Sequence, residues 1–247
     1  MERDSYRQHF ELEEIHWWFA GRREIILAAL DGLQGFSAEA LILDAGCGTG
    51  LTLRILGSLG KTFGFDFKEE ALRFCRKRDL ERLVRADAQR MPFKKQAFDV
   101  VVILDVLSHQ SIESDLDVLR NSYQILKKNG FLLVCESAFN FLFGPHDRAL
   151  HVRERYTCRG MRKRLSHVGF EVMKSTYFNF FLFLPVAGYK LWDKLFHAKK
   201  QPYLSHLYEM NEKLNSLLFR IMRAEAPLLR HVRFPFGSSL LCIAKKK

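Results

Sequence analysis

The chain has 247 residues, of which 48% are hydrophobic, and a formal net charge of +11 at pH 7. This length predicts one domain with an elaboration rather than two domains. The five cysteines are odd in number and scattered without a CxxC pair, which disfavours a zinc ribbon and a disulfide scaffold. Reduced thiols and a charged start without the apolar stretch of a signal peptide predict a cytoplasmic protein.

The basic residues are spread along the chain. Their charge suits a solvated surface, and it equally suits an anionic partner such as a phosphorylated substrate, a lipid headgroup or RNA. The most apolar run, 177–189, is too short for a transmembrane segment, which needs about 20 residues. We therefore expect no transmembrane segment, and this run is either core or a contact with a membrane surface.

Apolar runs alternate with amphipathic segments along most of the chain. Helical periodicity covers the first 35 residues. Strands are expected at 41–45, 62–67, 83–86, 98–106, 131–136, 171–178 and 239–244. Helices are expected at 52–59, 69–77, 116–126, 157–168 and over most of 185–225, with a break near Gln201 and Pro202. The Val/Ile/Leu run at 98–106 indicates a strand covered on both faces.

This alternation predicts an α/β fold with a parallel, doubly wound sheet. Ligands of such sheets bind beyond the carboxyl ends of the strands. We expect a single domain over 1–247, in which a helical cap (1–36) precedes a ligand-binding core (37–180), a helical insert (181–235) and a final strand (236–247).

A glycine-rich loop follows the first expected strand. Gly46, Gly48 and Gly50 let a ligand approach the backbone, and the next helix offers free N–H groups. A dinucleotide loop needs G-x-G-x-x-G, but Leu51 stands where its third glycine belongs. The phosphate-binding G-x-x-x-x-G-K-[ST] pattern is also missing. An ordinary glycine turn is the alternative.

Two acidic residues follow the next two strands. Asp66 comes about 20 residues after the glycine loop, where a carboxylate can accept both hydroxyls of a ribose. Asp87 can accept a hydrogen bond from an adenine amino group. The alternatives are a helix N-cap for Asp66 and a turn for Asp87.

The segments 43–50, 64–66, 86–88 and 98–101 resemble successive motifs of class I S-adenosylmethionine-dependent methyltransferases. The resemblance covers residues from about 40 to 137. It implies a Rossmann-like, seven-stranded sheet with an antiparallel last strand, N-terminal helices and a helical insert before that strand. It also implies S-adenosylmethionine as the cofactor. The cofactor-binding roles fall on Asp44, Gly46, Cys47, Gly48, Gly50, Asp66, Phe67, Asp87, Ala88 and the backbone of Leu104.

A second set of segments, 16–19 with Arg22 and Arg23, 155–157 and 234–240, resembles one subgroup of bacterial-type methyltransferases. In the family an N-terminal helix closes over the cofactor. The resemblance therefore implies that Arg22 or Arg23 pairs with the methionine carboxylate, unless both are merely solvated. It leaves the methyl acceptor open.

Methyl transfer from a sulfonium is an in-line displacement, so the protein mainly supplies alignment and desolvation. A base is needed only if the acceptor loses a proton. Candidate catalytic residues at expected strand ends are His109, His146 and Asp147, with Asp105 beside them. Arg155 and Tyr156 are candidates for acceptor binding. The alternatives are a helix-cap role for His109 and a solvated loop for 144–156.

The acceptor we expect is a small molecule or lipid-linked. The N/D-P-P-Y/F/W tetrapeptide that holds planar amino groups in related enzymes is absent, since the matching place reads 105–108, Asp-Val-Leu-Ser. No metal-ligand cluster is visible, which disfavours a magnesium-dependent type. An RNA methyltransferase is the alternative that the charge permits, without a separate RNA-binding module. A non-catalytic partner protein is the second alternative. The phenylalanines at 178–183 fit a substrate pocket, an interface or the core.

Overall fold

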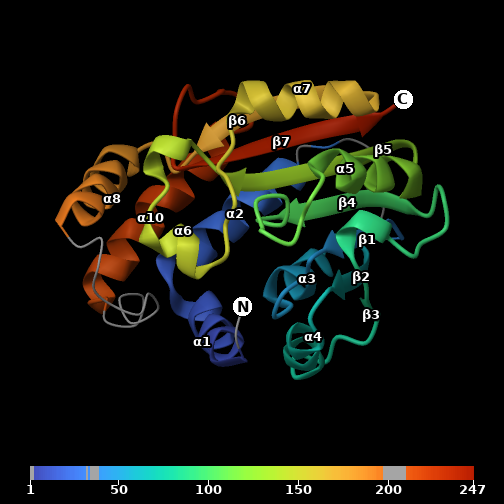
Figure 1. Ribbon diagram of the computed structural model, residues 1–247, viewed down its shortest axis with the longest axis horizontal. Helices are drawn as coiled ribbons and strands as arrows, with labels where there is room; N and C mark the ends of the chain where they lie inside the picture. Colours follow the sequence, from blue (N-terminus) through green and yellow to red (C-terminus); the bar gives the residue numbers. More distant parts are fainter. Residues whose placement is uncertain (1–2, 32, 34–38, 197–209) are drawn as a thin grey trace.

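The computed structural model describes residues 3–31, 33, 39–196 and 210–247 (Figure 1). Within these residues seven strands form one sheet in the order β3-β2-β1-β4-β5-β7-β6. The strands β1 to β5 run parallel, and β7 runs antiparallel between β5 and β6. Their bounds are β1 (Leu41–Ala45), β2 (Lys61–Asp66), β3 (Leu83–Arg85), β4 (Phe98–Leu104), β5 (Leu126–Ser137), β6 (Phe170–Phe178) and β7 (Ser239–Lys246). The expected Rossmann-like sheet with an antiparallel last strand is confirmed.

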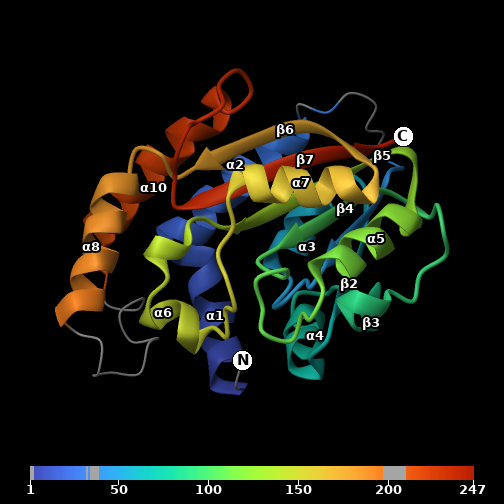
Figure 2. The same cartoon turned by 45° about the horizontal axis from the view of Figure 1, so that its top comes forward.

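Helices cover both faces of the sheet (Figures 1 and 2). The described α-helices are α1 (Arg3–Ile15), α2 (Trp17–Asp31), α3 (Leu51–Leu56), α4 (Glu69–Arg76), α5 (Asp115–Ile125), α6 (Pro145–Ala149), α7 (Cys158–Val168), α8 (Phe183–Phe196) and α10 (Glu212–Leu228). Two short 3-10 helices, η1 (Ala88–Arg90) and η2 (Asn140–Leu142), lie in loops. None of the helices in the described residues is long and apolar enough to cross a membrane.

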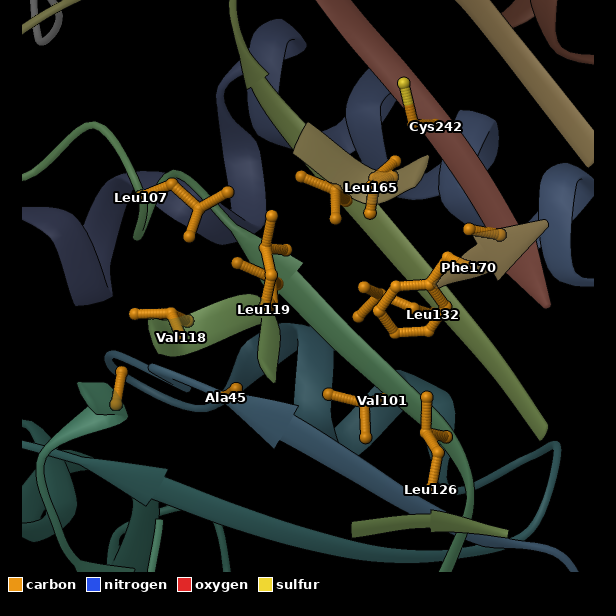
Figure 3. Close-up of a cluster of buried hydrophobic side chains, with 14 of the residues drawn as sticks. Ala45, Val101, Leu107, Val118, Leu119, Leu126, Leu132, Leu165, Phe170 and Cys242 are labelled. Carbon is orange, nitrogen blue, oxygen red and sulfur yellow. The ribbon is translucent and has the colours of Figure 1, made fainter. Parts of the chain in front are cut away.

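The core has one layer on each face of the sheet. Val101 and Leu132 pack with residues of α5 and α7, as Figure 3 shows. Val100 and Val102, the alternate residues of β4, pack on the other face with α2 and α10. Successive side chains of a strand point to opposite faces, so a central strand covered twice must be apolar throughout. This confirms the reading of the Val/Ile/Leu run.

The helical insert before β7 divides into two parts. Met222 of α10 is fully buried against α2, and a side chain at Gly21 would come within 2.6 Å of the Met222 Sδ. Asn215 accepts from the Trp17 N–H and donates to the Ile15 carbonyl at the corner between α1 and α2, both at 2.8 Å. The helix α10 therefore belongs to the core, whereas α8 lies at the outer edge of the molecule (Figures 1 and 2).

Several boundaries differ from the expected ones. The helix expected at 52–59 is the shorter α3, which ends at Leu56 with Gly57 as its C-cap, and the strand expected at 131–136 is the end of the longer β5. Lys68, rather than Asp66, stands at the N-cap of α4. The short elements α6, η1 and η2 give too few residues for a periodic signal. The break expected near 201–202 lies outside the described residues, and the four-part division of the domain stays a prediction.

Candidate functional site

The site lies where the order of strands reverses. The chain passes from β1 to β2 on one side, whereas β4 pairs with β1 on the other side. Crevices at the carboxyl ends of such strands bind ligands in open α/β sheets. The glycine loop, Asp66 and the residues after β4 all follow carboxyl ends at this place, as the sequence predicted.

The three glycines of the loop serve different purposes. All three have a positive φ, which residues with a side chain rarely adopt. The values are 81° at Gly46, 54° at Gly48 and 88° at Gly50. A Cβ at Gly50 would meet Cys75 Sγ at 2.8 Å, and one at Gly46 would collide with Val106. A Cβ at Gly48 would meet nothing within 4 Å. Gly46 and Gly50 are therefore required by packing, and Gly48 leaves open space for a ligand beside the backbone.

The carboxylate of Asp66 closes one end of this loop. Its Oδ2 accepts from the Gly48 N–H at 3.0 Å, and its Oδ1 accepts from the Lys68 N–H at 2.9 Å. Burial raises the pKa of Asp66, and these backbone N–H groups oppose the shift. The carboxylate is thus fixed in direction and keeps lone pairs for further donors.

Asp87 and its neighbours lie one strand further along the edge. Asp87 is the N-cap of η1 and accepts from the Gln89 N–H at 2.8 Å. Ala88 is buried in the core layer on this face. Phe67, just after β2, is exposed. The structure therefore brings these residues to the same edge of the sheet as Asp66.

Asp44 and Arg22 occupy the centre of the site. Asp44 is 1% exposed, and its Oδ1 has no hydrogen-bond partner in the described part of the chain. Burial raises the pKa of Asp44 to about 7, although the nearby Arg22 opposes the shift. Arg22 donates to Asp105, which follows β4 with a φ of 54°. A buried acid with one unpartnered oxygen and a partly buried arginine thus lie near the ends of β1 and β4.

The helix α1 packs over the glycine loop. Thr49 of the loop donates to Glu13, whose carboxylate also pairs with Arg78 at 2.8 Å. The Glu13 and Arg78 side chains are 9% and 2% exposed. Burial raises the pKa of the nearby phenol Tyr6, and the charge of Asp66 raises it further. The N-terminal segment therefore forms part of the site.

His109 lies in the loop that follows β4. Its Nδ1 is 2.8 Å from the Ser111 Oγ, and its ring centroid is 6.1 Å from that of His151. Burial lowers the pKa of His109, and the charge of Lys68 lowers it further. The imidazole is therefore held in its neutral form.

The α6 segment contains a buried ion pair. Arg155 donates to Asp147 Oδ1 from Nε at 3.0 Å and from Nη2 at 2.7 Å. The Gly144 N–H donates to the other oxygen of Asp147 at 2.8 Å, and Lys190 Nζ lies 3.7 Å from it. Burial lowers the pKa of the adjacent His146 to about 4, with a contribution from Lys190. His146 is therefore neutral, while Asp147 is fully engaged.

Tyr156 is placed differently from its sequence neighbour Arg155. It is 2% exposed and lies within the core layer. Its hydroxyl donates to Asp115 Oδ2 at 3.0 Å, and Arg153 donates to the other oxygen of Asp115 at 2.6 Å. This arrangement ties the segment after α6 to the start of α5.

Two further buried groups were not predicted. Glu136, at the end of β5, is fully buried, and its Oε1 accepts from the Leu107 N–H at 2.8 Å. Burial raises the pKa of Glu136 well above the ordinary value of a glutamate. His16 lies between α1 and α2, and burial lowers its pKa to about 4. Glu136 ends a strand that had been recognised, so its position was available as a signal, whereas the burial of His16 depends on tertiary contacts.

Throughout the described ranges no three His, Cys, Asp or Glu residues gather as a metal site. The five cysteines are free, with Cys47 Sγ and Cys75 Sγ 3.8 Å apart.

The comparisons with known proteins agree with this geometry. Residues 43–134 match a family model described as a methyltransferase domain. This matched region is therefore similar to methyltransferase domains. The family and the fold imply S-adenosylmethionine as its cofactor, and this match contains the glycine loop, Asp66 and Asp87.

Two curated relatives share the matched region. The ubiquinone/menaquinone biosynthesis C-methyltransferase UbiE of Azotobacter vinelandii is 35% identical over 115 residues, 42% of this chain and 45% of that protein. A tRNA (carboxymethyluridine(34)-5-O)-methyltransferase of Arabidopsis thaliana is 30% identical over 105 residues, 41% of this chain and 25% of that protein. The chain thus spans less than half the length of these relatives.

A solved structure extends the likeness to most of the fold. An S-adenosylmethionine-dependent methyltransferase from Mesorhizobium loti aligns with a TM-score of 0.58 and 17% identity, over 88% of this chain and 95% of that chain. At this identity the likeness concerns the fold alone.

Proposed function

We propose that this chain is an S-adenosylmethionine-dependent methyltransferase that acts on a small-molecule or lipid-linked acceptor by direct in-line transfer. The observation that carries the proposal is the open space at Gly48, which is hydrogen-bonded to the half-buried Asp66, together with the buried Asp44 near the end of β1, at the reversal of strand order. Two acids near one backbone opening suit a ligand with a ribose and a cationic amino acid portion.

The residues present fit the cofactor. Asp66 keeps lone pairs for ribose hydroxyls, and the edge at Phe67, Asp87 and Ala88 suits the adenine ring. Asp44, with an unpaired buried oxygen, and the Leu104 backbone suit the methionine ammonium group. Arg22 has further N–H groups for the methionine carboxylate, since its contact with Asp105 uses one of them. Gly46, Cys47, Gly48 and Gly50 would form the loop beneath the methionine portion.

When bound, the cofactor supplies an activated methyl group on a sulfonium. The chain's own contribution is alignment and the exclusion of water. Helix α1, fixed to the loop through Glu13 and Thr49, covers one side of the site.

A base is required only for an acceptor that must lose a proton. We propose His146 and His109 for this role, because the lowered pKa of each keeps its imidazole unprotonated at neutral pH. Asp147 is engaged with Arg155 and the Gly144 N–H, so we propose that it holds α6 and the adjacent His146 in position. Arg155 and Tyr156 then contribute to acceptor binding indirectly. Their buried contacts hold the segment 144–156, which we call the acceptor wall.

Aromatic side chains support an apolar acceptor. Phe139, which follows β5, stacks on Tyr177 with ring centroids 4.7 Å apart and lies 6.1 Å from Phe183. Phe183 lies 5.1 Å from Phe236, which precedes β7. These four residues, the aromatic cluster, lie at the acceptor side of the sheet edge and offer a surface for a hydrocarbon or ring system.

An extract assay tests the proposal. Methyl-labelled S-adenosylmethionine and the protein are incubated with cell extract, which is then separated into organic-soluble, small water-soluble and RNA fractions. We expect the label in one of the first two fractions. Label that ribonuclease removes from the RNA fraction would contradict the proposed acceptor class. Cofactor binding without any transferred label would instead favour a non-catalytic partner protein.

A further inference from the structure

The outer face of α8 is apolar and exposed. Leu184, Leu191 and Leu195 recur at intervals of seven and four residues, which places them on one stripe of the helix. Leu184 and Leu195 are 74% and 75% exposed. Trp192 and Tyr189 extend the stripe sideways with exposures of 57% and 60%.

The opposite side of α8 is apolar as well. Ala187 is buried, and Phe183 and Val186 pack against the core or the aromatic cluster. Glu225 of α10 is fully buried and accepts from the Phe181 N–H at 2.9 Å, which fixes the turn that leads into α8. Lys190 is an exception among the inward residues, since its Nζ lies 3.7 Å from Asp147 of α6. One side of α8 is thus held by the protein and the other faces outward.

The topology places α8 at the ligand edge of the sheet. Because β5 and β6 are both antiparallel to β7, the carboxyl end of β6 lies at the same edge as that of β5. Helix α8 follows this end of β6 and contacts η2, which follows β5. Figures 1 and 2 both show α8 beyond the ends of these strands, with α6 and α10 beside it. The exposed stripe is thus continuous with the acceptor side of the site.

The positive charge of the molecule favours an anionic surface as the partner of this stripe. The net charge of +11 attracts anionic surfaces. Arg148 of α6 and Arg220 of α10 are exposed on the elements beside α8. Helices that lie on lipid membranes combine three kinds of contact. Leucines enter the apolar layer, aromatic rings lie at its boundary, and cations contact the anionic headgroups.

We propose that α8 docks this protein on an anionic lipid surface and that the methyl acceptor is lipid-linked. This inference rests on the proposed function, whose acceptor class it narrows. The aromatic cluster lies between the stripe and the ends of β5 and β6, so a hydrocarbon chain leaving the bilayer at α8 meets aromatic rings on its way to the site.

Vesicle flotation tests the docking. The full chain is mixed with vesicles of phosphatidylcholine, with or without the anionic phosphatidylglycerol. We expect binding to the mixed vesicles that weakens at high salt, and little binding to phosphatidylcholine alone. Leu184→Glu and Leu195→Glu should each reduce the binding about tenfold, because each places a charge in the apolar layer.

The matched control is Val84→Glu, which makes the same change at an exposed residue of β3, the opposite edge of the sheet. It should bind mixed vesicles like the natural chain. In addition, label transferred to organic-soluble material of a membrane fraction should fall about tenfold for Leu195→Glu and stay unchanged for Val84→Glu.

Calorimetry with S-adenosylmethionine separates the two proposals. All three variants should bind the cofactor as the natural chain does, since none of the residues lies in the site. Failure of vesicle binding with intact cofactor binding would overturn the docking alone. Failure of cofactor binding with intact vesicle binding would overturn the proposed function, and with it the lipid-linked acceptor, but not the docking. A dimer in sedimentation that Leu195→Glu dissociates would show that α8 is an interface between copies, and would also overturn the docking.

Discussion

Asp44 is the residue at which stability and cofactor binding conflict. Its pKa of about 7 exceeds the ordinary value of 3.8, so the folded state binds a proton more tightly than the unfolded chain does. The cost of ionising Asp44 is absent at low pH, grows as the pH rises between these two values, and is constant above about pH 7. Ionised Asp44 therefore destabilises the ligand-free fold, and a cationic ligand beside it would offset this cost.

We therefore predict opposite effects for Asp44→Asn. The variant should unfold at a higher temperature than the natural chain near neutral pH, and this gain should shrink as the pH falls toward the ordinary pKa of an aspartate. Cofactor affinity should fall at the same time. Scanning calorimetry at several pH values, with exposed Asp117→Asn as the control, measures the first effect. Equal melting temperatures at neutral pH would contradict the account of Asp44.

A second prediction concerns Asp66, the proposed ribose acceptor. Asp66→Ala should weaken cofactor binding by about 1–3 kcal/mol, the scale for stranding buried hydrogen-bond donors. Titration calorimetry provides the value, and Asp117→Ala serves as the control. An unchanged affinity would mean that another acid holds the ribose.

At this scale the sequence was most informative about residues that follow strands. Gly48, Asp66 and Asp87 lie at or just after the ends of successive strands. Their order along the chain was therefore enough to predict that they share one edge of the sheet. The partners of Arg22 and Arg155 could not be foreseen. Arg22 pairs with a residue 83 positions away, and such contacts depend on how the helices pack.

At the scale of elements, α1 is held to the core by a buried ion pair. Glu13 joins Thr49 of the glycine loop to Arg78, which follows α4. Glu13→Gln should lower the free energy of unfolding by about 3 kcal/mol, because the buried guanidinium of Arg78 loses its nearer and more buried carboxylate partner and keeps only the half-exposed Glu14. Urea denaturation measures this change. Glu11→Gln is the control, since Glu11 forms an exposed pair with Arg7 that contributes less than about 1 kcal/mol. Similar losses for both variants would argue against the buried pair.

The α6 segment allows a positioning role to be separated from a catalytic one. Asp147→Asn should lower the free energy of unfolding by about 3–5 kcal/mol, because Arg155 stays buried without a full counter-charge. Urea denaturation measures the loss. The control is His146→Ala, for which we expect a smaller loss of stability and a loss of methyl transfer to an acceptor that carries a proton. An Asp147→Asn variant of natural stability would favour a direct catalytic role for Asp147.

The prediction of elements succeeded where periodicity extends over enough residues. The strands other than β5, and helices such as α5 and α7, were expected within two or three residues of their bounds, whereas β5 begins five residues before the expected strand. The helix α6 was missed because five residues give no periodic signal, although it carries His146 and Asp147. The different positions of α8 and α10 could not be predicted either, since both helices carry apolar residues at helical spacing. The packing of Met222 against Gly21 shows that α10 enters the core.

At the scale of the whole molecule, the same edge of the sheet gathers the cofactor loop, the acceptor wall and the apolar stripe of α8. This follows from topology, because β5 and β6 run in the same direction and their following segments meet at one edge. The central claim is that this edge binds S-adenosylmethionine. Titration calorimetry of the natural chain with S-adenosylmethionine tests it most directly. We predict saturable binding with one cofactor per chain, and the absence of binding at millimolar cofactor would contradict the account.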